Sequence, residues 1–459
     1  MKATIIILAC LLTYATCSKP SFQPGFRLDT SPGFKPDIFS NIIDHFNDDV
    51  GLYPQRFWYN AENFDQKTGP IFLYICGEYE CGVNEQRQFP VEVSKEHNGL
   101  FVYLEHRYYG ASQPFDNLET ENLRYLTSRH ALADIAVFLS TLNDLIVQVH
   151  GGEKRKIIVV GGSYPGALSA WFRAKYPHIA DASWASSAVV NAIEDLELYD
   201  WQIFNSTSRS DAHTCTETIQ SMTEYLDELL SGQDSTALEE VKAAFKANTL
   251  TNGDFAFYIA DIFVGEVQYG KRTKLCEFLA TLVELEDIEK FYKLAEKYYD
   301  PEDNKSYYDR HLMAKTEVIV PDSSRAWAYQ YCTEFGFFQT TYEGIHMRSE
   351  HLARAYWDQR CNEIFGKEII AQARETNVEF GALKVKGTNT FYTNGGEDPW
   401  IWAGVFDDND ALNQKARRLQ GENCGHCVVL YNEEESDSEE LRAVRKEIKD
   451  WLDAILYTN

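Results

Sequence analysis

Positive charge is scarce in this sequence. The chain has 43 lysine and arginine residues against 70 aspartate and glutamate residues, which gives a formal net charge of −27. Nucleic acids and anionic membranes bind proteins through basic surface, so this balance argues against both as partners. Internal repeats, metal-ligand spacings and phosphate-binding glycine patterns are also missing, and we expect no metal and no cofactor.

Long hydrophobic runs are missing as well. One short run near the start, Ile5 to Leu12, follows Met1-Lys2 and precedes the small residues Ala15-Thr-Cys17. It is shorter than the roughly 20 residues that span a bilayer, and its flanks are typical of a secretory signal peptide rather than of an N-terminal anchor. We therefore expect residues 1–17 to be removed, and the mature protein to be soluble and secreted or lysosomal.

A strand followed by a sharp turn is the most informative segment of the chain. Four β-branched residues, Ile157 to Val160, lead into Gly161-Gly-Ser-Tyr-Pro-Gly166, and helix formers follow. This order places Ser163 at the apex of a turn between a buried strand and a helix, which is how an α/β-hydrolase exposes its nucleophile. The match to G-x-S-x-G is imperfect, since Pro165 stands where the last glycine is usual. An ordinary tight loop is the alternative.

Partners for such a serine must follow it in the order acid, then histidine. Asp398 comes after the β-rich run Thr388 to Thr393, and His426 comes after a second short run, Ala416 to Gln420. An imidazole can take the serine proton, and a carboxylate can orient the imidazole. Asp398 and His426 therefore complete a candidate triad with Ser163, although a capping aspartate and an ordinary loop histidine are the simpler interpretations. Other histidines nearer the serine, His106, His130 and His178, fall outside the expected order.

The tetrapeptide Cys424-Gly-His-Cys427 also matches a thioredoxin-type redox site. Such a site lies near the start of a domain that continues through further strands and helices. Here only a single amphipathic helix follows, with Leu441, Ile448 and Leu452 on its apolar side. We therefore favour the hydrolase interpretation.

Five motifs in order give the chain a resemblance to a known family. They are Glu105-His-Arg-Tyr-Tyr-Gly110, Gly161-Gly-Ser-Tyr-Pro-Gly166, Tyr331-Cys-Thr-Glu-Phe-Gly336, Thr393-Asn-Gly-Gly-Glu-Asp-Pro-Trp400 and Gly425-His-Cys427. The chain resembles the serine peptidases grouped around lysosomal Pro-Xaa carboxypeptidase, dipeptidyl peptidase II and thymus-specific serine protease. The thymus-specific type looks most similar, because of the segments Trp171 to His178 and Cys332 to Phe338.

The resemblance implies an α/β-hydrolase fold with a mostly parallel sheet and an inserted helical cap. It also implies an enzyme that cleaves peptides near a chain end, commonly after proline. It implies an oxyanion hole formed by the backbone N–H groups of Tyr164 and of Gly77 or Glu78. The carboxylate of Glu78 is an alternative partner for a peptide's free amine. Trp400 and Phe337 are expected to line an apolar site for the residue before the scissile bond. Cys76-Gly-Glu-Tyr79 departs from the family's glycine-rich loop, which leaves substrate preference open.

Cysteines and sequons agree with a secretory protein. Of ten cysteines, eight lie beyond Cys10 and Cys17, and an even number in a secreted chain favours disulfides. Many pairings are open; we favour Cys332 with Cys361 and Cys215 with Cys276, which leaves Cys76, Cys81, Cys424 and Cys427 on loops near the serine. Asn205 and Asn304 begin glycosylation sequons.

The pattern of elements divides the mature chain into a split core and a cap. Alternating strands and helices in residues 18–191 indicate a parallel sheet, residues 192–384 read as mostly helical, and residues 385–459 return to the sheet. The leading hypothesis is a serine exopeptidase acting on peptides. An esterase or lipase on the same fold, or a non-catalytic binding protein, is the alternative. The choice between monomer and homodimer, and among carboxypeptidase, dipeptidyl peptidase and endopeptidase, stays open.

Overall fold

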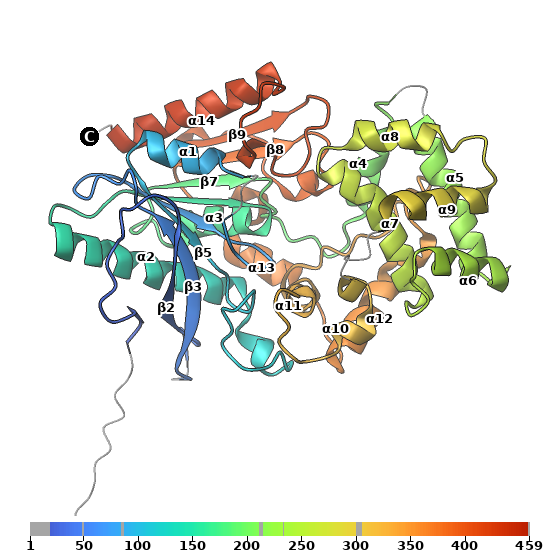
Figure 1. Ribbon diagram of the computed structural model, residues 1–459, viewed down its shortest axis with the longest axis horizontal. Coiled ribbons are helices and arrows are strands. Elements are labelled where there is room, and N and C mark those ends of the chain that lie inside the picture. The colour runs from blue at the N-terminus through green and yellow to red at the C-terminus, as the bar shows by residue number, and fades with distance from the viewer. Residues whose placement is uncertain are drawn as a thin grey trace, which may run out of the picture.

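The computed structural model describes residues 19–47, 50–83, 87–210, 214–232, 234–299 and 305–457. The expected signal peptide and Asn304 lie outside these residues. Within them the chain forms one mixed, mostly parallel sheet with helices on both faces, and a group of helices beside it (Figure 1). The expected fold class is confirmed.

Nine described strands form the sheet in the order β1-β2-β3-β5-β4-β6-β7-β8-β9. The pairs β1–β2, β2–β3 and β3–β5 are antiparallel, and the pairs that follow in this order are parallel. Their bounds are β1 Ser21–Phe22, β2 Lys35–Ile42, β3 Leu52–Asn60, β4 Ile71–Ile75, β5 Leu100–Leu104, β6 Ile157–Gly162, β7 Ala182–Ser186, β8 Thr390–Gly395 and β9 Gln414–Leu419. The strands β4 to β8 are buried on both faces, which explains their nearly continuous apolar character.

Helices cover both faces of the sheet. One face carries α1 (Phe89–Glu96) and α14 (Glu439–Tyr457), and the other carries α2 (Ser128–His150) and α3 (Tyr164–Lys175) (Figure 1). By length and composition α2 could cross a membrane, but more than half of its apolar window is buried inside the protein. It therefore reads as a core helix.

The chain between β7 and β8 is mostly helical in its described part and adds no strand to the sheet. Its α-helices are α4 Glu197–Thr207, α5 Thr214–Leu230, α6 Ser235–Ala244, α7 Asn252–Gln268, α8 Arg272–Ala280, α9 Asp287–Tyr298, α10 Arg310–Met313, α11 Ser324–Gln330, α12 Arg354–Phe365 and α13 Ala373–Phe380. Most of them form a lobe to one side of the sheet, while α13 returns beneath it (Figure 1). We call this lobe the cap; its expected limits at residues 192 and 384 stay a prediction.

Disulfides hold the cap and one loop of the core. The favoured pairs Cys215–Cys276 and Cys332–Cys361 are both present, and a third bridge joins Cys76 to Cys81. Cys424 and Cys427 are unbonded, so their expected place among the disulfides is wrong. The reason is local packing: the Sγ of Cys427 faces Gly162, whereas that of Cys424 faces Gly421.

Candidate active site

Ser163 sits at the junction between β6 and α3. Its backbone has φ 65° and ψ −132°, a region that residues with side chains rarely occupy. The N–H of Ser163 donates to the carbonyl of Ser186 at 2.9 Å, which fixes the turn against the end of β7. This sharp turn lifts the hydroxyl above the carboxyl edge of the sheet, as the sequence predicts.

Two glycines make the turn possible by letting backbones approach. A Cβ on Gly161 would lie 2.2 Å from the carbonyl oxygen of Pro165, and one on Gly166 would lie 2.8 Å from that of Ser186. Pro165 itself occupies the first turn of α3, where its missing N–H has no cost. Its ring packs against Gly77, with the Cγ 3.1 Å from where a Cβ would stand. The proline thus supports the loop after β4.

His426 and Asp398 are hydrogen-bonded in the structure. The Nδ1 of His426 lies 2.7 Å from the Oδ2 of Asp398, and the two side chains are 4% and 0% exposed. The other carboxylate oxygen of Asp398 accepts the N–H of Trp400 at 2.9 Å, so this residue is also a helix cap. Because a carboxylate only accepts, Nδ1 of His426 carries the proton and Nε2 is left for chemistry.

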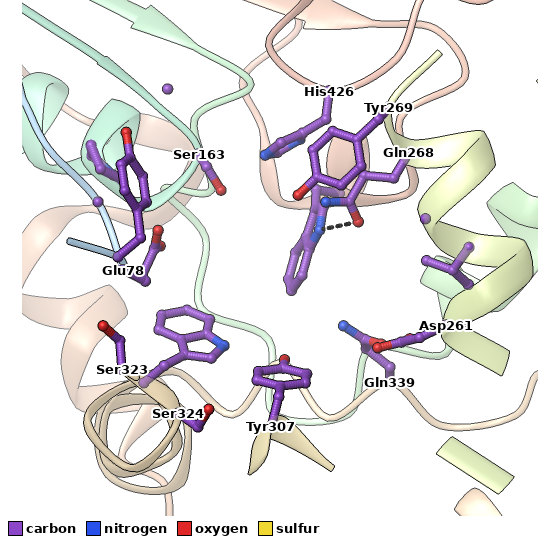
Figure 2. A pocket seen from close by; sticks show the side chains of 18 of the residues that line it. Glu78, Ser163, Asp261, Gln268, Tyr269, Tyr307, Ser323, Ser324, Gln339 and His426 are labelled. Atoms are coloured by element: carbon purple, nitrogen blue, oxygen red, sulfur yellow. Dashed lines mark hydrogen bonds between the residues drawn. The ribbon is translucent and has the colours of Figure 1, made fainter. Parts of the chain in front are cut away.

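The pKa of His426 lies well above its ordinary value. Burial acts to lower it, but the Asp398 carboxylate and the neighbouring Cys427 outweigh burial. Asp398 therefore stabilises the imidazolium that forms when a histidine accepts a proton. Ser163 and His426 face each other at one end of a cavity (Figure 2).

This cavity, which we call the catalytic cavity, has a volume of about 510 Å³ and lies between the sheet and the cap. The core contributes Ser163, His426, Gly77 and Glu78, and the cap contributes residues of α7 and of the segment before α11. Figure 2 shows Glu78 on one side and Asp261, from α7, on the other. A chain end of a peptide fits a space of this size.

Of the expected oxyanion donors, one borders the cavity and the other follows Ser163 in the chain. Gly77 lines it, and Tyr164 follows Ser163 as the first residue of α3, so its N–H has no partner within the helix. Two N–H groups so placed can stabilise charge on a carbonyl oxygen. The Tyr164 hydroxyl is held from behind, since it lies 3.0 Å from Nε2 of His106.

Glu78 lines the cavity with a carboxyl that holds its proton unusually tightly. Burial raises its pKa to about 7, against the opposing effects of its own backbone N–H and of His426. A cationic group in the cavity would favour the ionised form.

Of the two residues expected to line an apolar site, Trp400 lines the cavity and Phe337 packs behind it. Trp400 lines the cavity, and its Nε1 donates to the Oε1 of Gln268 at 3.1 Å. Phe337 is 4% exposed and packs edge-on behind Trp400, with ring centroids 5.4 Å apart. The expectation that Phe337 lines the site is therefore corrected: a left-handed backbone at Gly336 and Phe337 turns its ring inward to stack on Phe335.

Several residues of the cavity had no signal in the sequence. They come mainly from cap helix α7 and its neighbours, and include Asp261, Gln268, Tyr269 and Tyr307. Gln268 also holds the histidine loop, because its carbonyl accepts the N–H of His426 at 2.6 Å. No spacing rule connects α7 to a loop so distant in the chain.

Two further interpretations of the sequence concern a glycosylation site at Asn205 and a redox site that includes Cys424. Asn205 lies partly exposed on α4, and its glycosylation stays a prediction. Burial raises the pKa of the Cys424 thiol to about 11, which disfavours the thiolate that a redox site needs.

Comparisons with known proteins identify the family that the chain matches. The family described as serine carboxypeptidase S28 matches residues 41–448. The chain is 34% identical to the probable serine protease EDA2 of Arabidopsis thaliana over 84% of this chain and 79% of that protein. It is 29% identical to the thymus-specific serine protease of Mus musculus, over 94% and 91% of the two chains. Among solved structures, an acetylester hydrolase from Corynebacterium glutamicum is similar with a TM-score of 0.39 and 10% identity, over 92% of this chain and 97% of that one.

Proposed function

Because the chain belongs to the serine carboxypeptidase S28 family and is by that membership a serine peptidase, we propose that it is an exopeptidase with the triad Ser163, His426 and Asp398. The observation that carries this proposal is the 2.7 Å bond between His426 and Asp398 beside Ser163, at one end of a confined cavity. We propose further that the enzyme prefers proline before the scissile bond.

The reaction follows from the roles of these groups. The Oγ of Ser163 attacks the peptide carbonyl while Nε2 of His426 takes its proton, and the carbonyl oxygen becomes an oxyanion beside Tyr164 and Gly77. His426 then gives the proton to the departing amine, which leaves an acyl-enzyme. Water, deprotonated by the same histidine, attacks the acyl carbon and restores Ser163.

Two features support the choice of exopeptidase and of proline. The carboxyl of Glu78 can neutralise the amine of a peptide N-terminus inside the cavity. The indole of Trp400 offers a flat apolar wall, which suits a ring that has no N–H to satisfy.

The location of the protein belongs to the same proposal. Three disulfides require an oxidising compartment, and we therefore place the enzyme in the secretory pathway, either secreted or lysosomal.

Covalent labelling tests the triad. A fluorophosphonate probe should label Ser163, and Ser163→Ala should lower kcat on the order of 10³-fold or more, because triad members act as a unit. Peptide mapping of the labelled protein identifies the site. Turnover by the alanine variant at the normal rate would rule the triad out.

Proline-containing peptides blocked at one end or the other test the exopeptidase assignment. Cleavage that needs a free N-terminus indicates a dipeptidyl peptidase, and cleavage that needs a free C-terminus indicates a carboxypeptidase. Equal cleavage of doubly blocked peptides would contradict both.

A further inference from the structure

Asp261 is an acidic residue of the cap that faces the catalytic cavity. It lies on α7, on the side of the cavity opposite Glu78 (Figure 2), and the residue is half-buried. Its Oδ2 accepts a long hydrogen bond of 3.3 Å from the hydroxyl of Tyr308. Its Oδ1 is itself buried and has no hydrogen-bond partner among the described residues. The carboxylate thus has unused acceptor capacity beside the cavity.

The charge of Asp261 is not neutralised within the described part of the chain. The two arginines whose charges reach it, Arg348 and Arg360, form their ion pairs with other carboxylates, Asp200 and Asp254. Burial raises the pKa of Asp261 to about 7, and Arg348 only partly opposes this. An isolated carboxylate at this depth is costly unless a cation joins it.

Aromatic rings surround the same part of the cavity. Tyr199, Tyr307 and Tyr308 line it, and the rings of the last two meet edge to face at 5.2 Å. Aromatic faces attract ammonium and guanidinium groups, and they exclude water that would screen a charge. A carboxylate among such rings has the chemistry of a cation site.

We propose that Asp261 determines specificity by binding a cationic group of the peptide substrate, an ammonium or a guanidinium, within the tyrosine-walled part of the catalytic cavity. This inference rests on the proposed peptidase function. A basic side chain and the free N-terminus of the peptide present the same chemistry, and the test must separate them.

Matched peptides provide that test. Each pair carries lysine or its neutral isostere norleucine at one position near the proline, and each pair is made with a free and with an acetylated N-terminus. The wild-type kcat/KM should favour either lysine over norleucine at one position or more, or the free over the acetylated N-terminus, by about 10-fold or more, since a charge-assisted contact is worth that ratio. If a side chain is the source, acetylation leaves this preference intact. If the N-terminus is the source, acetylation lowers kcat/KM for lysine and norleucine peptides alike.

Two variants assign the effect to Asp261. Asp261→Asn should reduce the affected ratio, lysine over norleucine or free over acetylated, to near unity, and Asp261→Glu should keep part of it. Glu284→Gln removes an exposed charge from the same cap and should leave the ratio unchanged.

The outcomes separate this inference from the proposed function. A wild-type enzyme that cleaves neutral proline peptides but ignores both charges overturns the inference alone, as does an Asp261→Asn variant that keeps the full ratio. Failure of the wild type to cleave any peptide would overturn the proposed function instead.

Discussion

Asp398 caps a short helix and holds His426 with different atoms of one carboxylate. Oδ1 caps the short helix at Pro399–Ala403, and Oδ2 holds the Nδ1 of His426. The cap fixes the carboxylate in the orientation that the histidine needs, which is the usual value of supporting contacts around a reactive group. The simple interpretation of Asp398 as a capping residue is thus true, and it is compatible with the role in the triad.

A pH profile follows from the electrostatics of His426. The histidine must be neutral to accept a proton, and its pKa is raised, so activity should be lost as pH falls through a limb centred above the ordinary value of about 6.5. The rate of inactivation by a fluorophosphonate across pH measures this limb without involving a peptide amine. A midpoint below the ordinary value would contradict the raised pKa.

Glu78 is a second group whose titration can affect the pH profile. Its pKa of about 7 should add a second acid limb only for substrates whose amine it binds. Glu78→Gln should therefore remove the second limb from the pH profile of peptide cleavage, while fluorophosphonate inactivation keeps a single limb, that of His426.

The grouping of the three residues of the proposed triad could be predicted because their types and order are restricted. Ser163 follows a β-branched strand, and Asp398 and His426 follow later strands, so the sheet brings them to one edge. Asp261 could not be predicted, since no local pattern links a single acid within the apolar helix α7 to a serine so distant in the chain. Phe337 was misplaced because an aromatic next to a cavity and one behind its wall look alike in sequence.

At the scale of elements, the cap is fastened to the catalytic loops of the core. The carbonyl of Gln268, at the end of α7, holds the N–H of His426. Glu397, beside the catalytic acid, accepts two bonds of 3.1 Å from Arg272 at the start of α8, and Arg209 also lies 3.1 Å from it. Both catalytic loops after β8 and β9 therefore rest on cap residues.

The buried ion pair of Glu397 should contribute to stability. Its side chain is 0% exposed, so Glu397→Gln deprives the buried guanidinium of Arg272 of its buried counter-charge and should lower the free energy of unfolding by about 3 kcal/mol. Glu422→Gln is the matched control, because Glu422 meets the same arginine at 3.6 Å but is 75% exposed; it should cost about 0.5 kcal/mol or less. Urea titration of both variants makes the comparison, and equal losses would contradict it.

At the scale of the molecule, local periodicity predicted the core better than the cap. The strand predicted from Ile157 is β6, because its run of β-branched residues is a strong apolar pattern. The contacts of the cap with the core join residues far apart, such as Arg272 and Glu397 with a separation of 125, and no local pattern encodes them.

The disulfides make a prediction for the whole mature chain. With three bridges formed and Cys424 and Cys427 unbonded, the denatured, unreduced protein should react with two equivalents of a thiol reagent. Reduction should lower the melting temperature, since native bridges contribute roughly 2 to 5 kcal/mol each. A count of zero would indicate a fourth bridge, and a count of eight would refute the oxidising compartment.

The hydrogen bond from His426 to Gln268 also has a consequence for when the active site can form during biosynthesis. Ser163 emerges from the ribosome early, and the histidine emerges near the end, after the whole cap. Because the histidine loop rests on α7, we expect the proposed triad to assemble only after the cap has folded. A nascent or misfolded copy should therefore be inert toward the peptides around it, with hydrolytic activity appearing only at the end of folding.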